Sequence, residues 1–138
     1  MRLYRFFSLA LAVIFAAVGL FFLFRPEGVL DFFNRFSPQL GLAPAPVHSG
    51  SFFPILAVAY MYLVTLLAWL MYRKPGHPIL PLLLAQGKFA SSILSLVFFF
   101  GRAPYLVCLA NAVADGFIGA LVMWLYLLQK KHAGSWPT

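Results

Sequence analysis

Four long runs of apolar residues constrain the fold of this chain more than any other feature. Residues 3–24, 52–72, 79–100 and 104–128 would each extend at least ~30 Å as an α-helix, the thickness of a bilayer's hydrocarbon core. Only 9% of the 138 residues are charged, whereas soluble domains carry about 25%. The sequence therefore predicts an all-α integral membrane protein, with residues 1–138 forming a single four-transmembrane-helix bundle.

Other classes of protein fit this composition poorly. So apolar a chain is neither an ordinary soluble enzyme nor a disordered tail nor a nucleic-acid module, and we expect the lipid bilayer, not nucleic acid, as its partner. The single cysteine, Cys108, excludes an intrachain disulfide and Cys-rich metal clusters. His48, His77 and His132 are expected in loops or tails, which disfavours a bis-histidine haem. We predict no cofactor and no metal site, and the sequence leaves open whether the chain is an enzyme.

The basic residues predict how the spans are oriented. The first span follows Arg2 and Arg5, but it is far longer than the ~7–15 apolar residues of a signal peptide and lacks a small-residue cleavage site. An uncleaved first span and an even number of spans place both termini on one side. That side carries six bases, and the positive-inside bias makes it cytoplasmic; with compact loops, this fits a bacterial inner membrane. The six are Arg2, Arg5, Arg73, Lys74, Lys130 and Lys131, against Arg25, Arg35 and Arg102 on the opposite side.

The loop after the first span contains an amphipathic segment, residues 26–36. Its apolar residues recur at i, i+3, i+4 and i+7, which indicates a helix with one apolar face. Pro26 suits a first helical turn, and Ser37-Pro38 is expected to stop the helix. We interpret it as a short interfacial helix that seals the outer end of the bundle; a lid over a cavity is the alternative. The apolar residues are Val29, Phe32, Phe33 and Phe36.

Two opposite charges fall inside the third and fourth predicted spans. Lys88 and Asp115 each lie about 17 Å below the outer surface, at ~1.5 Å per residue. Because the turn at residues 101–103 is short, the two spans form an antiparallel hairpin in which the charges can meet. An unpaired charge near the bilayer centre costs roughly 2.5–3.5 kcal/mol. We therefore expect both side chains to face the bundle interior.

Polar side chains accompany each charge at helical spacing. Ser91, Ser92 and Ser95 share a stripe with Lys88, and Cys108 and Asn111 share one with Asp115. Two interpretations remain open. The charges and polar groups can line a pocket for a ligand, a proton or an ion, or the Lys88–Asp115 pair can fix the register of the hairpin or a contact with another subunit.

The overall architecture resembles that of the small four-helix DoxX-like membrane proteins. The first span ends in Gly19-Leu20-Phe21 and continues through Arg25-Pro26-Glu27, an outer interfacial segment follows, and three more spans complete the chain. The resemblance implies a bacterial inner-membrane protein, and some relatives are tied to quinone or redox complexes. No functional residue is carried over, because Lys88 and Asp115 match no signature of that family.

Two functions follow as hypotheses. The first is a non-enzymatic accessory or interaction subunit organised by a buried Lys88–Asp115 pair, with a membrane-protein partner or a second copy of the chain. The alternative is binding, transport or enzymatic handling of a lipid-soluble ligand, quinone or isoprenoid-like, at a polar pocket around that pair. A filled interior favours the first, and a cavity of several hundred Å³ beside the pair favours the second.

Overall fold

The computed structural model of the chain describes residues 2–47, 53–102 and 104–133. Within them, four helices are long and apolar enough to cross a membrane, as the sequence predicts. A shorter helix follows the first of these, and a 3-10 turn follows the shorter helix. The elements are α1 (Arg2–Phe24), α2 (Pro26–Phe36), η1 (Ser37–Leu40), α3 (Phe53–Arg73), α4 (Ile79–Gly101) and α5 (Leu106–Ala133).

The last helix is longer than we expected. The apolar run stops at Leu128, but α5 continues to Ala133, because glutamine, lysine and alanine favour helix although they are not all apolar. His132, which we expected in a loop or tail, therefore lies in the final turn of α5. The other predicted bounds agree to within about two residues, the usual uncertainty of a helix end. His48, Phe52 and Ala103 lie outside the described residues.

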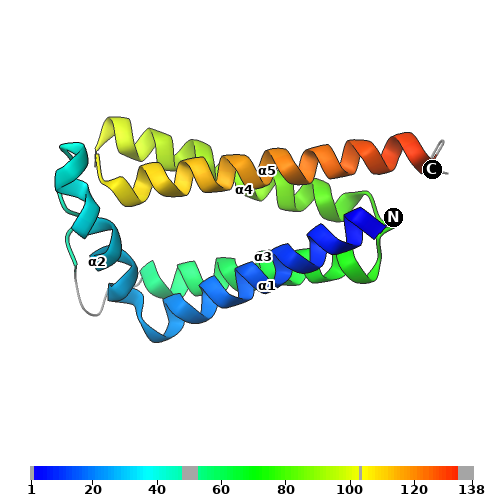
Figure 1. Ribbon diagram of the computed structural model, residues 1–138, viewed down its shortest axis with the longest axis horizontal. Helices are drawn as coiled ribbons and strands as arrows, with labels where there is room; N and C mark the ends of the chain where they lie inside the picture. The colour runs from blue at the N-terminus through cyan, green and yellow to red at the C-terminus, as the bar shows by residue number, and fades with distance from the viewer. Residues whose placement is uncertain (1, 48–52, 103, 134–138) are drawn as a thin grey trace.

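The four long helices are arranged as two pairs. Helix α1 packs along α3, and α4 packs along α5, while α2 lies across one end and contacts both α1 and α5. Both termini and the α3–α4 turn lie at the opposite end (Figure 1). We call that opposite end the terminal end. The two pairs come together toward the terminal end and diverge toward α2.

The buried core occupies the half of the molecule nearest the terminal end. It takes residues from positions 4–15 of α1 and 61–71 of α3, and it continues onto α4 and α5. Burial of these apolar side chains joins the two helix pairs in this half. The core residues are Tyr4, Leu11, Ala12, Phe15, Met61, Val64, Ala68, Met71, Leu84, Ala85, Val122 and Leu125.

The α2 end is closed by a short helix and a pinned loop. Pro26 occupies the first turn of α2, where its missing N–H is not needed. At Ser37 the α-helix gives way to η1, which ends at Gly41 in the left-handed conformation (φ 67°). The Asn34 side chain then holds the irregular segment that follows η1. It donates to the Ala45 carbonyl (2.9 Å) and accepts from the Ala45 N–H (2.7 Å).

Candidate functional site

Lys88 and Asp115 form a direct ion pair between α4 and α5. The Lys88 Nζ lies 2.8 Å from Asp115 Oδ1, and the residues are only 2% and 5% exposed. Two buried charges are tolerated when they satisfy one another, because each offsets the desolvation of its partner. The pair is therefore closed, with no face of either charged group open to the surroundings.

Two aromatic rings from the other helix pair cover the ammonium group. The Lys88 Nζ lies 4.7 Å from the ring centroid of Phe15 on α1 and 5.0 Å from that of Tyr60 on α3. Both distances suit a cation–π interaction, in which the negative face of a ring attracts a cation. One ammonium group on α4 thus contacts side chains from the other three long helices.

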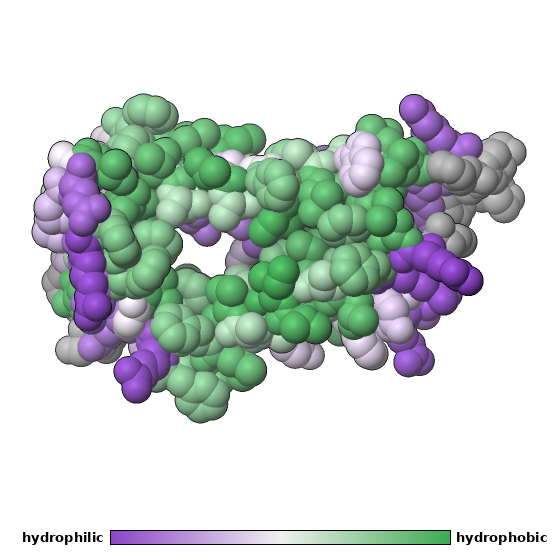
Figure 2. Space-filling model, in the orientation of Figure 1, coloured by the Kyte–Doolittle hydropathy of each residue, from purple (hydrophilic) through white to green (hydrophobic). Residues whose placement is uncertain are grey.

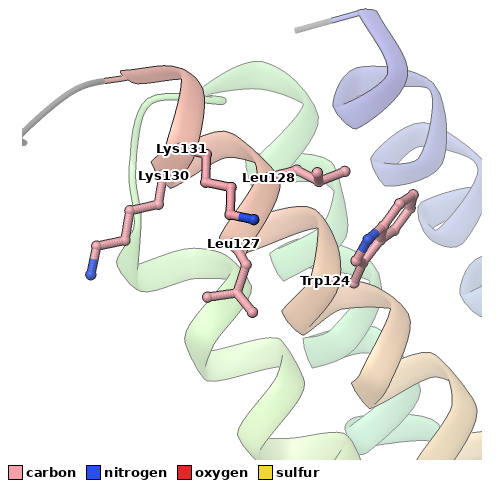
Figure 3. Close-up of a pocket in the computed structure, with 5 residues that line it drawn as sticks. All are labelled: Trp124, Leu127, Leu128, Lys130 and Lys131. Atoms are coloured by element: carbon pink, nitrogen blue, oxygen red, sulfur yellow. The ribbon is translucent and has the colours of Figure 1, made fainter.

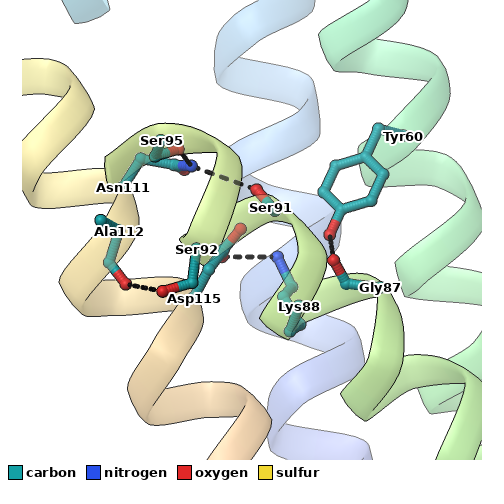
Figure 4. A network of polar contacts seen from close by, with 9 residues as sticks. All are labelled: Tyr60, Gly87, Lys88, Ser91, Ser92, Ser95, Asn111, Ala112 and Asp115. Carbon is teal, nitrogen blue, oxygen red and sulfur yellow. Dashed lines mark hydrogen bonds and ion pairs between the residues drawn. The ribbon is translucent and has the colours of Figure 1, made fainter. Parts of the chain in front are cut away.

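A series of hydrogen bonds extends from the ion pair along the α4–α5 seam (Figure 4). Ser92 Oγ donates to the carbonyl of Ala112 (2.7 Å). The Asn111 amide nitrogen donates to Ser91 Oγ (3.2 Å) and to Ser95 Oγ (2.8 Å). All six predicted site residues therefore join α4 to α5, although Asn111 is exposed rather than turned toward the interior.

Two glycines allow the helices of this pair to approach closely. A Cβ atom at Gly116 would lie 3.0 Å from Ser92 Oγ, and one at Gly119 would lie 3.0 Å from the Phe89 ring. These separations are tighter than ordinary van der Waals contact, so a larger residue at either position would displace the Ser92 or Phe89 side chain. The close approach is what lets the short Ser92 side chain reach the Ala112 backbone.

A cleft of about 550 Å³ lies between α3 and the α4–α5 pair. Figure 2 shows the surface hollowed between the two helix pairs. The cleft begins at Tyr60, whose ring covers Lys88, so the ion pair lies where the core ends and the cleft starts. Its wall is mostly apolar, with hydroxyl and thiol groups along one side. The lining residues are Tyr60, Gly87, Ala90, Ser91, Leu94, Ser95, Phe98 and Cys108.

The polar groups in the cleft can both donate and accept hydrogen bonds. Ser91 and Ser95 accept from Asn111, and a serine hydroxyl that accepts retains its own hydrogen for donation. Tyr60 donates to the Gly87 carbonyl (3.2 Å), which leaves its oxygen lone pairs for accepting. A ligand with carbonyl or hydroxyl groups would find complementary partners at this wall.

Several residues of this site were not anticipated from the sequence. Phe15 gave no signal, because one phenylalanine among sixteen is not marked as a cation partner by spacing. Tyr60 lines the cleft, while Tyr62, two residues further along α3, is 70% exposed. Phe98 forms part of the cleft wall and is 51% exposed. Among the residues that the structure describes, no group of His, Cys, Asp and Glu is placed to hold a metal.

Comparison of the chain with protein-family models, with curated proteins and with solved structures found no match. The resemblance to DoxX-like proteins therefore stays a prediction, and the functional argument depends on the geometry of the cleft and of the ion pair beside it.

Proposed function

We propose that this chain is a small multi-pass membrane protein that binds a lipid-soluble ligand with a polar head group, of the quinone or isoprenoid kind. The ligand would occupy the cleft between α3 and the α4–α5 pair. The observation that carries the proposal is the composition of the cleft wall, where Leu94 and Phe98 provide apolar surface beside the polar groups of Ser91 and Ser95.

A membrane setting accounts for the surface of the molecule. Large apolar side chains are exposed on all four long helices, including Phe6 (67%), Ile55 (62%), Phe100 (80%) and Phe117 (70%). In water such a surface would be costly, whereas in a bilayer it contacts acyl chains. The six-to-three distribution of bases supports cytoplasmic termini and a bacterial inner membrane. The apolar face of α2 would then rest on the outer interface.

In a bilayer the cleft is accessible to an occupant. The cleft of about 550 Å³ is open to the surroundings, so a lipid or a ligand can enter it and make van der Waals contacts with its wall. Volumes of roughly 300–1,000 Å³ are typical of small-molecule sites, which combine apolar walls with a few placed polar groups. An acyl chain fills apolar space but makes no use of the serine hydroxyls. A molecule with a carbonyl head and an isoprenoid tail uses both.

The ion pair supports this site structurally. Lys88 and Asp115 are in direct contact and nearly inaccessible, so the pair positions α4 against α5 instead of binding the ligand itself. Tyr60 links it to the cleft, since its ring covers the ammonium and its hydroxyl donates to Gly87. In this proposal the ion pair has the structural role, and the neighbouring cleft is the ligand site.

The proposal is tested by filling the cleft. Leu94→Trp would place an indole in the cleft, and we expect it to weaken binding of a short-tail ubiquinone by at least roughly tenfold, because overpacking excludes the head group. Ile93→Trp is the matched control, since Ile93 is 60% exposed and is not a lining residue. Binding is measured by titration of purified protein in nanodiscs, and co-purified lipids are identified by mass spectrometry.

The same experiment has a clear contrary outcome. If the unaltered protein neither retains a lipid-soluble molecule with a polar head nor binds the added quinone, the cleft is not a ligand site. Equal binding by the Leu94→Trp and Ile93→Trp proteins would place the quinone elsewhere on the molecule.

An accessory or interaction subunit is the second candidate, and the closed ion pair favours it. An ion pair whose charges satisfy one another suits a structural role better than a role in ligand binding or catalysis. The cleft would then receive a helix from a partner protein or from a second copy of the chain. Native mass spectrometry distinguishes the two candidates. A ligand-binding protein retains a mass of several hundred daltons, whereas an interaction subunit retains another polypeptide chain.

A further inference from the structure

We propose that the last turns of α5 form a second site, which binds the head group of an anionic phospholipid. A shallow recess of about 430 Å³ lies there, far along α5 from the cleft (Figure 3). Its lining combines two cations with a largely apolar remainder. The lining residues are Trp124, Leu127, Leu128, Lys130 and Lys131.

The charge at the terminal end has no counterpart within the protein. Six bases gather there, while the three acidic residues of the chain are Glu27 and Asp31 on α2 and Asp115, which is paired with Lys88. In the described parts of the chain, the Lys88–Asp115 contact is the one ion pair present. The bases at the terminal end therefore carry a positive charge that no acidic side chain of the protein offsets.

The recess places its cations and its apolar surface in the order that a phospholipid requires. Figure 3 shows the Lys131 side chain running back along α5 toward Leu127, as expected because helical side chains lean toward the N-terminus. The Lys130 side chain extends outward from the helix, away from Leu127. Lys130 and Lys131 are exposed and can contact a phosphate. Trp124 (48% exposed) and Leu127 (49% exposed) lie further from the end of the chain, where an acyl chain would continue.

This geometry favours a lipid over a free anion or an acidic protein. A free phosphate would use the lysines and leave Trp124 and Leu127 without a contact, and a protein partner would need a broader surface. Adjacent basic residues and an interfacial tryptophan are the features by which proteins hold anionic lipids at the cytoplasmic surface. The inference depends on the membrane setting proposed above but not on the cleft ligand.

Tryptophan quenching by brominated lipid tests the site. Trp69→Phe with Trp136→Phe leaves Trp124 as the one indole, and the protein is placed in phosphatidylcholine nanodiscs containing a small fraction of brominated phosphatidylglycerol. We expect stronger quenching than with the same fraction of brominated phosphatidylcholine. Lys130→Gln with Lys131→Gln should weaken the phosphatidylglycerol interaction by roughly 30-fold, from the contribution of two basic residues near an anionic surface.

The control pair is Arg73→Gln with Lys74→Gln, which removes the same charge from the same end of the molecule. The site is supported if this control keeps the preference for phosphatidylglycerol, and it is overturned if both double variants lose it equally, since the preference then reflects diffuse charge. Quenching by phosphatidylcholine alone, with no preference, also overturns the site while leaving the membrane setting intact. Displacement of the lipid by millimolar inorganic phosphate would identify a free-anion site and overturn the assignment to lipid.

Native mass spectrometry of the unaltered chain provides a measurement that needs no tryptophan substitution. With equal phosphatidylglycerol and phosphatidylcholine supplied, the unaltered protein should retain phosphatidylglycerol, and the Lys130→Gln, Lys131→Gln protein should retain roughly equal amounts of the two. Equal retention by the unaltered protein overturns the proposal.

Discussion

The ammonium group of Lys88, on α4, contacts each of the other three long helices. It pairs with Asp115 on α5 and lies against Phe15 on α1 and Tyr60 on α3. The core lies on one side of these contacts and the cleft on the other. Because the charge is nearly inaccessible, the stability of the fold depends on this contact being complete.

Breaking the ion pair from one side should therefore be costly. We expect Lys88→Ala or Asp115→Ala to lower the free energy of unfolding by about 3–5 kcal/mol, because each leaves an unpaired buried charge. The double variant Lys88→Met, Asp115→Leu should recover much of the loss, since it removes both charges and retains apolar volume. Unfolding is followed by denaturant titration of the detergent-solubilised protein.

Lys74→Met is the control for removing a lysine, because Lys74 is exposed in the α3–α4 turn. It should unfold like the unaltered protein. Single variants at Lys88 and Asp115 that also unfold like the unaltered protein would contradict the structural role of the pair.

The sequence predicted part of this site because helix geometry converts residue numbers into depth. Counting back from the short turn near Arg102 placed Lys88 and Asp115 at one level, and the two side chains are in contact. Asn111 was placed on the same face as Asp115, yet it is exposed while donating to Ser91 and Ser95. Its amide bridges to α4 at the edge of the seam without being buried, which spacing alone does not reveal.

At the scale of elements, the α2 segment shows what periodicity can and cannot predict. The i, i+3, i+4, i+7 pattern and Pro26 predicted a helix over residues 26–36, which matches α2. The path of the chain after η1 was not predictable, because it depends on one side chain. Asn34 forms two hydrogen bonds with Ala45, eleven residues later. No local sequence pattern predicts such a contact.

Removing that side chain should release the loop without unfolding the helices. We expect Asn34→Ala to cost about 1–3 kcal/mol locally, because the Ala45 N–H and carbonyl lose their partner. Amide exchange at Ala45 should then become roughly tenfold faster or more, as measured by hydrogen–deuterium exchange with mass spectrometry.

Gln39→Ala provides a comparison within the same segment, since Gln39 is exposed on η1. Exchange at Ala45 should be unchanged in that variant. If the Asn34→Ala and Gln39→Ala proteins exchange alike, the two hydrogen bonds do not hold the loop.

At the scale of the whole molecule, the four apolar helices were predictable but the divergence of the two pairs was not. In a membrane protein, residues that face lipid and residues that face another helix are equally apolar, so hydropathy gives the number of helices and not their packing. At the α4–α5 seam, Gly116 and Gly119 allow close approach of the two helices. No corresponding signal marks the cleft, because its wall is defined by distance between helices.

The proposed orientation predicts which ends of the molecule face the cytoplasm. With six bases at the terminal end, green fluorescent protein fused after Thr138 should fluoresce in a bacterial host, and alkaline phosphatase fused there should be inactive. Alkaline phosphatase inserted within residues 41–47 should be active. The reverse pattern would show that the terminal end faces outward.

The ion pair also bears on how the chain is made. Asp115 follows Lys88 by 27 residues, so a ribosome completes α4 well before it delivers the counter-charge. A nascent α4 released alone into lipid would carry an uncompensated lysine, at roughly 2.5–3.5 kcal/mol. In the membrane setting proposed above, we therefore expect the insertion machinery to hold α4 at its lateral exit until α5 arrives, so that the two helices enter the lipid together.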